Sequence, residues 1–344
     1  MCPPADRRTV LAFDIGGANL KAADGRGDAH AEPFPLWRQP QRLAPRLAEL
    51  VAERRPGRVV ATMTGEIADC YASRAEGVQA IVAAVVAAAR PVAAPVAILA
   101  TDGALVAPEA ACAAPLTVAA ANWHAVARLA AAQAPAFPAV SIDVGSTTVD
   151  VIPLVAGSPA PRAAYDVGRL RSGELVYTGV ERTPVAALVR RVDRGGIACP
   201  VVAERYALSR DAWLLLGGLA EDPADTDTAD GRPFTRPLSR ARLARMILED
   251  PEAFSSADAL ALAEACAAAQ SRAVARALRR VAAALPAPPA AVVLSGHGDC
   301  LARRALGVVG WRVPVVSVAE RLGPAVARVA PAHALALVAL GELP

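Results

Sequence analysis

Hydrophobic positions follow two alternating patterns along the chain. Short, nearly continuous apolar runs are typical of buried strands, and they occur at residues 9–14, 20–24, 59–63, 96–101, 290–295 and 313–318. Segments with apolar side chains at helical spacing predict helices at residues 40–53, 73–90, 119–133, 183–192, 205–218, 239–249, 257–285, 299–306 and 332–340. Strands that alternate with helices predict an α/β protein.

Two of the predicted helices carry further local signals. Leu43, Leu47, Leu50 and Val51 lie on one face of the helix at 40–53, which predicts an amphipathic helix packed on a core. The helix at 73–90 begins with a serine that Glu76 follows three positions later, which is a capping box. Residues 221–237 are polar and carry Pro and Asp, so we expect a loop there.

The opening pattern returns near the middle of the chain. VLAFDIGGANLKAAD (10–24) and AVSIDVGSTTVDVIP (139–153) both contain an apolar strand, an Asp, an aliphatic residue, a Gly, small polar residues and a second strand. Such a repeat predicts two similar domains, at 1–138 and 139–344, with a helical insertion at about 183–288 in the second. The alternative is a chance likeness between two hairpins.

Composition and charge narrow the class of protein. The net charge is only +3, aromatic residues make up 4 %, and no basic block occurs, so we expect no nucleic-acid partner. The most apolar region, 77–100, is interrupted by Arg90, Pro91 and Pro95, so we expect no membrane span. No apolar stretch precedes the first strand, and the six cysteines form no CxxC pair. We therefore expect no signal peptide, cysteines buried as small hydrophobes, and a cytoplasmic protein.

Each repeat contains a glycine corner with the residue types that bind phosphate. Glycine lets backbone amides approach an anion, and an Asp at a strand end can hold a divalent cation. A third such element, AVVLSGHGD (291–299), connects a strand to a helix. The candidate residues are Asp14, Gly16, Gly17 and Asn19 in the first corner, Asp143, Gly145, Ser146, Thr147 and Thr148 in the second, and Ser295, Gly296, His297 and Gly298 in the third.

Two facing corners would bind a polyphosphate from both sides. We expect Asp14 and Asp143 to hold Mg²⁺ there, because two carboxylates near a polyphosphate need a cation to offset repulsion. Alternatives stay open for individual residues. The two Asp side chains could cap turns, Thr148 could serve the strand through its β-branch, and His297 could cap a helix.

Lys21 is the only lysine among the 36 basic residues, and it follows the first corner. Lysine is a compact charge on a flexible stem, which the planar guanidinium of arginine does not always replace. We therefore expect Lys21 to have a function at this corner. The alternative is that the position of the single lysine is an accident.

The three corners resemble the two phosphate motifs and the adenosine motif of the acetate and sugar kinase/Hsp70/actin superfamily. More closely, the chain resembles the hydantoinase/oxoprolinase-related branch of tetrahydromethanopterin-linked C1-transfer pathway proteins. The segments that carry this likeness are FDIGGANLKAAD, MTGEIADCY with SRAEGV, ATDG, AAANWHA, SIDVGSTTVDVIP, DVGRLRSGELVYTGVERTP, DTDTADGRP and LSGHGD.

The resemblance implies two RNase H-like α/β domains with a ligand cleft between them. It also implies a non-methyl alkyl or aryl transferase of methanofuran or methylofuran synthesis, a part of C1 metabolism. Archaeal members join an aminomethyl-furanylmethyl diphosphate to the phenol of γ-glutamyltyramine and release pyrophosphate. The implied partners are these small molecules, and the question of a homo-oligomer stays open.

The resemblance implies further site residues. Lys21 would be catalytic and would follow the oxygens of the departing diphosphate. Glu66 would be catalytic as well, and Asp69 of the same segment is a further candidate. Residue type and local pattern make Asp102, Asn122, Trp123 and Asp230 candidates for substrate binding. Each has a plainer alternative: Asp102 an Asx-turn, Trp123 helix packing instead of stacking on a furan or phenol ring, and Asp230 a solvated loop instead of a lid.

Two other classes of function use the same corners. An ATP-dependent small-molecule kinase or amidohydrolase would place ATP there. A nucleotide-switched interaction protein of the actin/Hsp70 kind would do the same, but no substrate-binding domain or filament-like insert is evident in the sequence.

Overall fold

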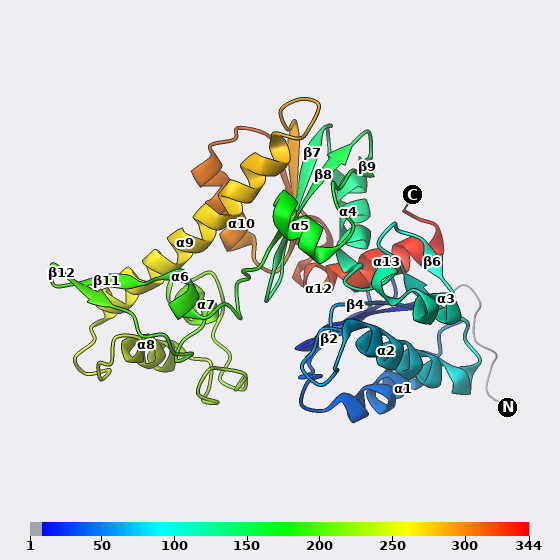
Figure 1. The fold of residues 1–344 in the computed structure, drawn as a ribbon, viewed down its shortest axis with the longest axis horizontal. Coiled ribbons are helices and arrows are strands. Elements are labelled where there is room, and N and C mark those ends of the chain that lie inside the picture. The colour runs from blue at the N-terminus through cyan, green and yellow to red at the C-terminus, as the bar shows by residue number, and fades with distance from the viewer. Residues whose placement is uncertain (1–8, 344) are drawn as a thin grey trace.

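The computed structural model describes residues 9–343. Cys2 and the N-terminal segment in which we expect no signal peptide lie outside these residues. The chain forms two α/β domains and a smaller lobe (Figure 1). This arrangement confirms the predicted fold class.

The first sheet has the order β3-β2-β1-β4-β5-β6. Its strands are β1 (Val10–Ile15), β2 (Asn19–Ala23), β3 (Ala29–Pro33), β4 (Arg58–Met63), β5 (Val96–Leu99) and β6 (Leu105–Val106). β1 pairs antiparallel with β2 and parallel with β4. Side chains alternate between the faces of a sheet: Leu11 and Phe13 pack under α1 (Leu43–Arg54) and α2 (Arg74–Ala89), whereas Val10 faces the other way.

The second sheet repeats this plan with the order β10-β8-β7-β13-β14, and β9 pairs with β8. Its strands are β7 (Ala139–Val144), β8 (Val149–Val155), β9 (Ser158–Pro159), β10 (Leu175–Val176), β13 (Ala291–Gly296) and β14 (Val315–Ser317). β7 again pairs antiparallel with the next strand and parallel with β13. α9 (Ser256–Ala282) and α10 (Asp299–Val309) cover one face.

Two helices join the domains. α4 (Asn122–Gln133) and α13 (Ala330–Leu340) lie between the sheets in Figure 1 and share one apolar core with both of them. Ala334 and Leu335 of α13 pack with Val10 of the first sheet, although α13 comes from the end of the chain. The domain boundaries therefore stay a prediction, and the packing shows that the two domains share their central core.

The smaller lobe corrects the prediction of a helix at 183–192. The chain forms only a short helix, α6 (Val185–Leu188), followed by a hairpin of β11 (Arg191–Arg194) and β12 (Ile197–Pro200). Gly195 and Gly196 both have positive φ, 62° and 82°, as a two-residue hairpin turn requires. α7 (Ser209–Leu215), α8 (Arg236–Arg245) and the start of α9 complete the lobe, which has its own apolar core.

The remaining helices are short. They are α3 (Pro108–Ala113), α5 (Asp166–Ser172), α11 (Val318–Leu322) and α12 (Pro324–Arg328), with 3-10 turns at Pro40–Arg42, Arg90–Val92 and Pro115–Thr117.

α2 and its 3-10 extension are long and apolar enough to cross a membrane by length and composition. In the structure, however, Val78, Ile81 and Val85 of α2 are fully buried in the core of the first domain. The expectation of buried cysteines holds only in part. Of the five cysteines in the described residues, Cys266 is buried and the other four are half-buried.

Candidate active site

The first corner is the turn of the β1–β2 hairpin. The Gly16 N–H donates to the Asn19 carbonyl at 3.0 Å, which closes the turn. Asp14 lies directly opposite Lys21 in the hairpin register. As a result, Lys21 Nζ lies 3.3 Å from Asp14 Oδ2, and the corner carries a cross-strand ion pair.

The second corner has the same backbone. The Gly145 N–H donates to the Thr148 carbonyl, again at 3.0 Å. Asp143 lies opposite Asp150 in the β7–β8 register, so a second carboxylate takes the place that Lys21 has in the first corner. The repeat seen in the sequence is therefore a repeat of hydrogen bonds and register.

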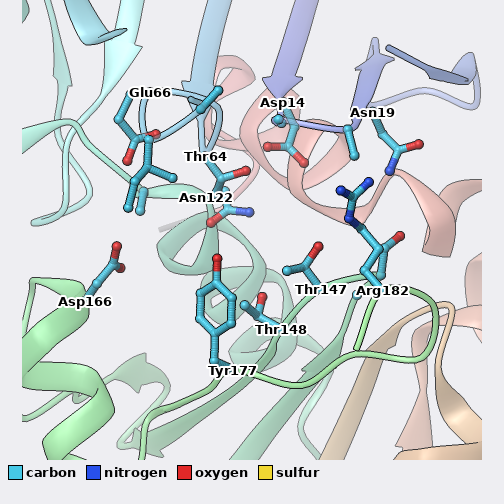
Figure 2. Close-up of a pocket in the computed structure, with 18 of the residues that line it drawn as sticks. Asp14, Asn19, Thr64, Glu66, Asn122, Thr147, Thr148, Asp166, Tyr177 and Arg182 are labelled. Atoms are coloured by element: carbon cyan, nitrogen blue, oxygen red, sulfur yellow. The ribbon is translucent and has the colours of Figure 1, made fainter. Parts of the chain in front are cut away.

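Both corners line one cavity of about 470 Å³ (Figure 2). The predicted site residues that line it are Asp14, Gly16, Gly17, Asn19, Lys21, Glu66, Asn122, Asp143, Gly145, Ser146, Thr147 and Thr148. Asp69 of the Glu66 segment lines it as well.

Backbone amides are available to an anion at both corners. The N–H groups of Gly17, Ala18, Ser146 and Thr147 donate no hydrogen bond to any described residue, and all four residues line the cavity. Successive unpaired amides at a turn form a concave anion-binding site. The two corners thus present matching donors to one ligand space.

The third corner does not line this cavity. A Cβ on Gly296 would lie 2.2 Å from the Val144 carbonyl oxygen, so this glycine is needed for close packing on β7. The Ser295 hydroxyl donates to Asp143 Oδ1 at 2.7 Å. A role in nucleotide binding stays a prediction for this corner (Ser295, Gly296, His297 and Gly298). In the structure the corner packs against β7 and its hydrogen bond to Asp143 supports the second corner.

His297 completes that support. Its Nε2 lies 3.1 Å from Glu181 Oε1 and 3.5 Å from Ser146 Oγ. Burial alone would raise the pKa of Glu181, but the hydrogen bond and charge of His297 hold it well below the usual range.

Three predicted substrate residues lie outside the cavity, and the contacts of two of them, Asp102 and Trp123, fit their plainer alternatives. Asp102 Oδ1 accepts the Ala104 N–H at 2.9 Å, which is the Asx-turn. Trp123 is 1 % exposed, and the Arg169 guanidinium covers its ring at 4.4 Å, so the indole packs inside the protein. Asp230 forms ion pairs with Arg242 and Arg245 at 3.0 and 3.1 Å, which fix it within the smaller lobe.

In the second corner Asp150 pairs with Arg169, whereas Asp143 forms no ion pair with the described residues. Burial and the neighbouring Asp150 raise the pKa of Asp143 to about 6, although the Ser295 hydroxyl and the Lys21 ammonium oppose this. Burial also raises the pKa of Asp150, against the effect of the ion pair that it forms with Arg169. This region therefore favours a cation.

Sequence reasoning missed several cavity residues. They are Trp37, Thr64, Arg74, Asp150, Asp166, Arg169, Tyr177, Arg182 and Arg205. Arg74 lies in the segment SRAEGV, and Asp166, Arg169, Tyr177 and Arg182 lie in DVGRLRSGELVYTGVERTP. Both segments carry the family likeness, and that likeness was the only signal in the sequence for these residues.

The predicted Mg²⁺ fits these residues if a phosphate ligand accompanies it. Asp14 Oδ1 is buried without a hydrogen-bond partner, as expected for an oxygen that faces a cation. Within residues 9–343, no group of three or more His, Cys, Asp or Glu side chains could hold a metal alone. Mg²⁺ is commonly bound through one or two carboxylates together with substrate phosphates and waters. Asp14 and Asp143 match that mode.

Fold and site together define a two-domain α/β protein whose cavity suits an anionic ligand. The chain belongs to the hydantoinase/oxoprolinase family, whose sequence profile matches residues 58–338.

Two named synthases are similar to it. The (4-{4-[2-(gamma-L-glutamylamino)ethyl]phenoxymethyl}furan-2-yl)methanamine synthase of Methanocaldococcus jannaschii is 28% identical over 246 residues, 71% of this chain and 72% of that protein. The synthase of the same name from Methanococcus vannielii is 32% identical over 124 residues, 36% of this chain and 55% of the relative. These likenesses support a biosynthetic transferase.

Solved structures give a weaker likeness. An inorganic polyphosphate/ATP-glucomannokinase from Arthrobacter sp. strain KM is 15% identical, with 97% of this chain and 98% of that chain covered and a TM-score of 0.46.

Proposed function

We propose that the protein joins a furanylmethyl diphosphate to the phenol of a glutamyltyramine or related tyramine and releases pyrophosphate. The observation that carries this proposal is the meeting of two phosphate-type corners, with Lys21, in one cavity. The names of the two similar synthases supply the substrate class.

The difficult step is the departure of the diphosphate. The bond between the furanylmethyl carbon and the diphosphate oxygen breaks, and its electron pair leaves with the diphosphate. The phenol oxygen then bonds to the resonance-stabilised carbon, and the phenol proton ends on the released pyrophosphate. Lys21 lies in the cavity wall with its side chain 20% exposed, so its ammonium can follow the leaving oxygens. A bound Mg²⁺ would neutralise charge on the diphosphate, and Asp14 and Asp143 would hold it.

The cavity also offers aromatic surface to an aromatic acceptor. Trp37, Ile67 and Tyr177 line it and are unusually exposed for large apolar side chains, at 41%, 58% and 64%. Figure 2 shows the Tyr177 hydroxyl pointing into the cavity beside Asn122. An aromatic ring with a polar end can pack on such side chains. Trp37 and Tyr177 replace Trp123 as candidates for stacking on a furan or phenol ring, and Ile67 adds apolar surface beside them.

A pyrophosphate-release assay tests the function. Three reaction mixtures are compared, each with Mg²⁺. The first contains the furanylmethyl diphosphate and tyramine, and the second replaces tyramine with phenethylamine, the matched acceptor without a hydroxyl. The third contains ATP in place of the furan donor. We expect pyrophosphate and the aryl ether in equal amounts with tyramine only. Turnover of ATP without any reaction of the furan donor would instead favour the ATP-dependent alternative.

A further inference from the structure

The cavity has an acidic side that the glycine corners do not occupy. In Figure 2, Glu66 and Asp166 lie on one side of the cavity, and Asp14, Asn19 and Arg182 lie on the other. Glu66 follows β4 of the first domain, and Asp166 begins α5 of the second. Both carboxylates bind the same nitrogen of Arg74: Nη2 lies 2.8 Å from Glu66 Oε1 and also donates to Asp166 Oδ2.

Arg74 is shared by the two carboxylates, Arg169 Nη1 lies 3.9 Å from Asp166 Oδ1, and a hydrogen-bond acceptor on Glu66 is left over. Glu66 is 0% exposed and lines the cavity, yet its Oε2 has no hydrogen-bond partner. A buried carboxylate oxygen without a partner is costly, unless a ligand supplies a donor. Burial raises the pKa of Glu66 even though Arg74 opposes this, and the nearby Asp166 adds to the rise. The nitrogens of Arg74 and Arg169 do not reach Glu66 Oε2, so this oxygen can accept a hydrogen bond from a ligand in the cavity.

We propose that Glu66 and Asp166 form a subsite for a primary ammonium group on the same substrate whose diphosphate lies at the glycine corners. The substrate would then be bound at its two ends by groups of opposite charge. This inference rests on the proposed function, and it uses the amine in the name of the similar synthases. It gives Glu66 a binding role in place of the proton-transfer role that a catalytic carboxylate would have.

The test compares two donors that differ only in this amine. One is the aminomethyl-furanylmethyl diphosphate, and the other carries a methyl group in place of the aminomethyl group. We expect the wild type to prefer the amine by about 10- to 100-fold in kcat/KM, the usual worth of a charged hydrogen bond. In Glu66→Gln, activity on the amine donor should fall by about that factor. Activity on the methyl donor should stay within about threefold, because that donor has no ammonium for Glu66 to bind.

Glu109→Gln is the matched control, because Glu109 is an exposed carboxylate of the same domain outside the cavity. This variant should turn over both donors at the wild-type rate. A second set of reactions uses p-cresol, an acceptor without an amine. These reactions show whether Glu66 binds the ammonium of the donor or that of the acceptor. If the preference for the amine donor persists there, the ammonium that Glu66 binds belongs to the donor.

The outcomes separate this inference from the proposed function. Equal turnover of both donors by the wild type would overturn the subsite and leave the transferase function intact, and this comparison does not depend on whether Glu66→Gln folds. Equal loss on both donors in Glu66→Gln would also overturn it, because a proton acceptor would affect both alike. No pyrophosphate from either donor would overturn the proposed function and the subsite with it.

Discussion

The two glycine corners have the same backbone conformation and differ in the sign of the charge at one position. Both close with a 3.0 Å hydrogen bond, from Gly16 to Asn19 and from Gly145 to Thr148. Opposite the strand-end Asp, however, the first corner has Lys21 and the second has Asp150.

The difference determines where positive charge is available. The ammonium of Lys21 faces the cavity, where a ligand can reach it. The cation of the second corner, Arg169, is 2% exposed, binds Asp150 and covers the Trp123 ring. The first corner therefore offers an accessible cation to a ligand. In the second corner, the cation Arg169 stabilises the fold, and Asp143 remains available to a metal.

Removal of the metal should have the largest effect. We expect exhaustive EDTA treatment to abolish pyrophosphate release and Mg²⁺ to restore it, since carboxylates facing a diphosphate need a cation between them. The measurement is turnover before treatment, after treatment and after addition of Mg²⁺. Activity that survives the chelator would remove the metal role from Asp14 and Asp143.

Lys21 should have the next largest effect. Loss of one well-placed charged donor typically costs about 3–4 kcal/mol, or roughly 10²–10³ in rate. We expect Lys21→Ala to lose about that much kcat, and Lys21→Arg to recover only part of it, because the planar fork cannot follow the leaving oxygens in the same way. The measurement is kcat at saturating Mg²⁺, with circular dichroism to show that both variants fold.

Lys21→Arg is decisive because it keeps the charge. Wild-type turnover in this variant would show that any cation suffices at the first corner. The single lysine would then be an accident of composition.

Local pattern was enough to predict most of the fold. Leu43, Leu47, Leu50 and Val51 are all buried in α1, as their spacing predicted. The Ser73 hydroxyl accepts the Glu76 N–H, as the capping box predicted, although the Glu76 carboxylate accepts from Ala72 instead of Ser73. β3 was missed because its half-buried sequence AHAEP has no apolar run.

The site was harder to predict, because the cavity depends on how the domains pack. Arg74 and Asp166 are 92 positions apart and meet only across the two domains. Trp123 looked like a ligand residue by its type, but α4 lies between the sheets and buries it. Patterns within one segment carry no information about such contacts.

The cation of the second corner should matter more for stability than that of the first, which is the reverse of the order that we expect for activity. Loss of one partner from a buried ion pair costs about 3–5 kcal/mol, so we expect Arg169→Met to destabilise the protein by about 3 kcal/mol. Adding Asp150→Asn should recover most of this loss, because no buried charge is then left alone. Lys21→Met should cost only about 1 kcal/mol, since Lys21 faces the cavity.

Urea unfolding of the four proteins measures these values. If Lys21→Met destabilised as strongly as Arg169→Met, both cations would be structural. The contrast between the corners would then fail.

The smallest effect concerns the support behind the second corner. His297 lowers the pKa of Glu181, so their pair stabilises the fold above the unfolded-state pKa of Glu, about 4.3, and this stability is lost as the pH falls below it. Glu181→Gln removes the titration. We expect the variant to be about 1 kcal/mol less stable than the wild type at pH 6, and the gap to close towards pH 3. Urea unfolding across this range measures the gap. Parallel curves would show that His297 does not stabilise the charged form of Glu181, and the second corner would then rest on Ser295 and the packing of Gly296 alone.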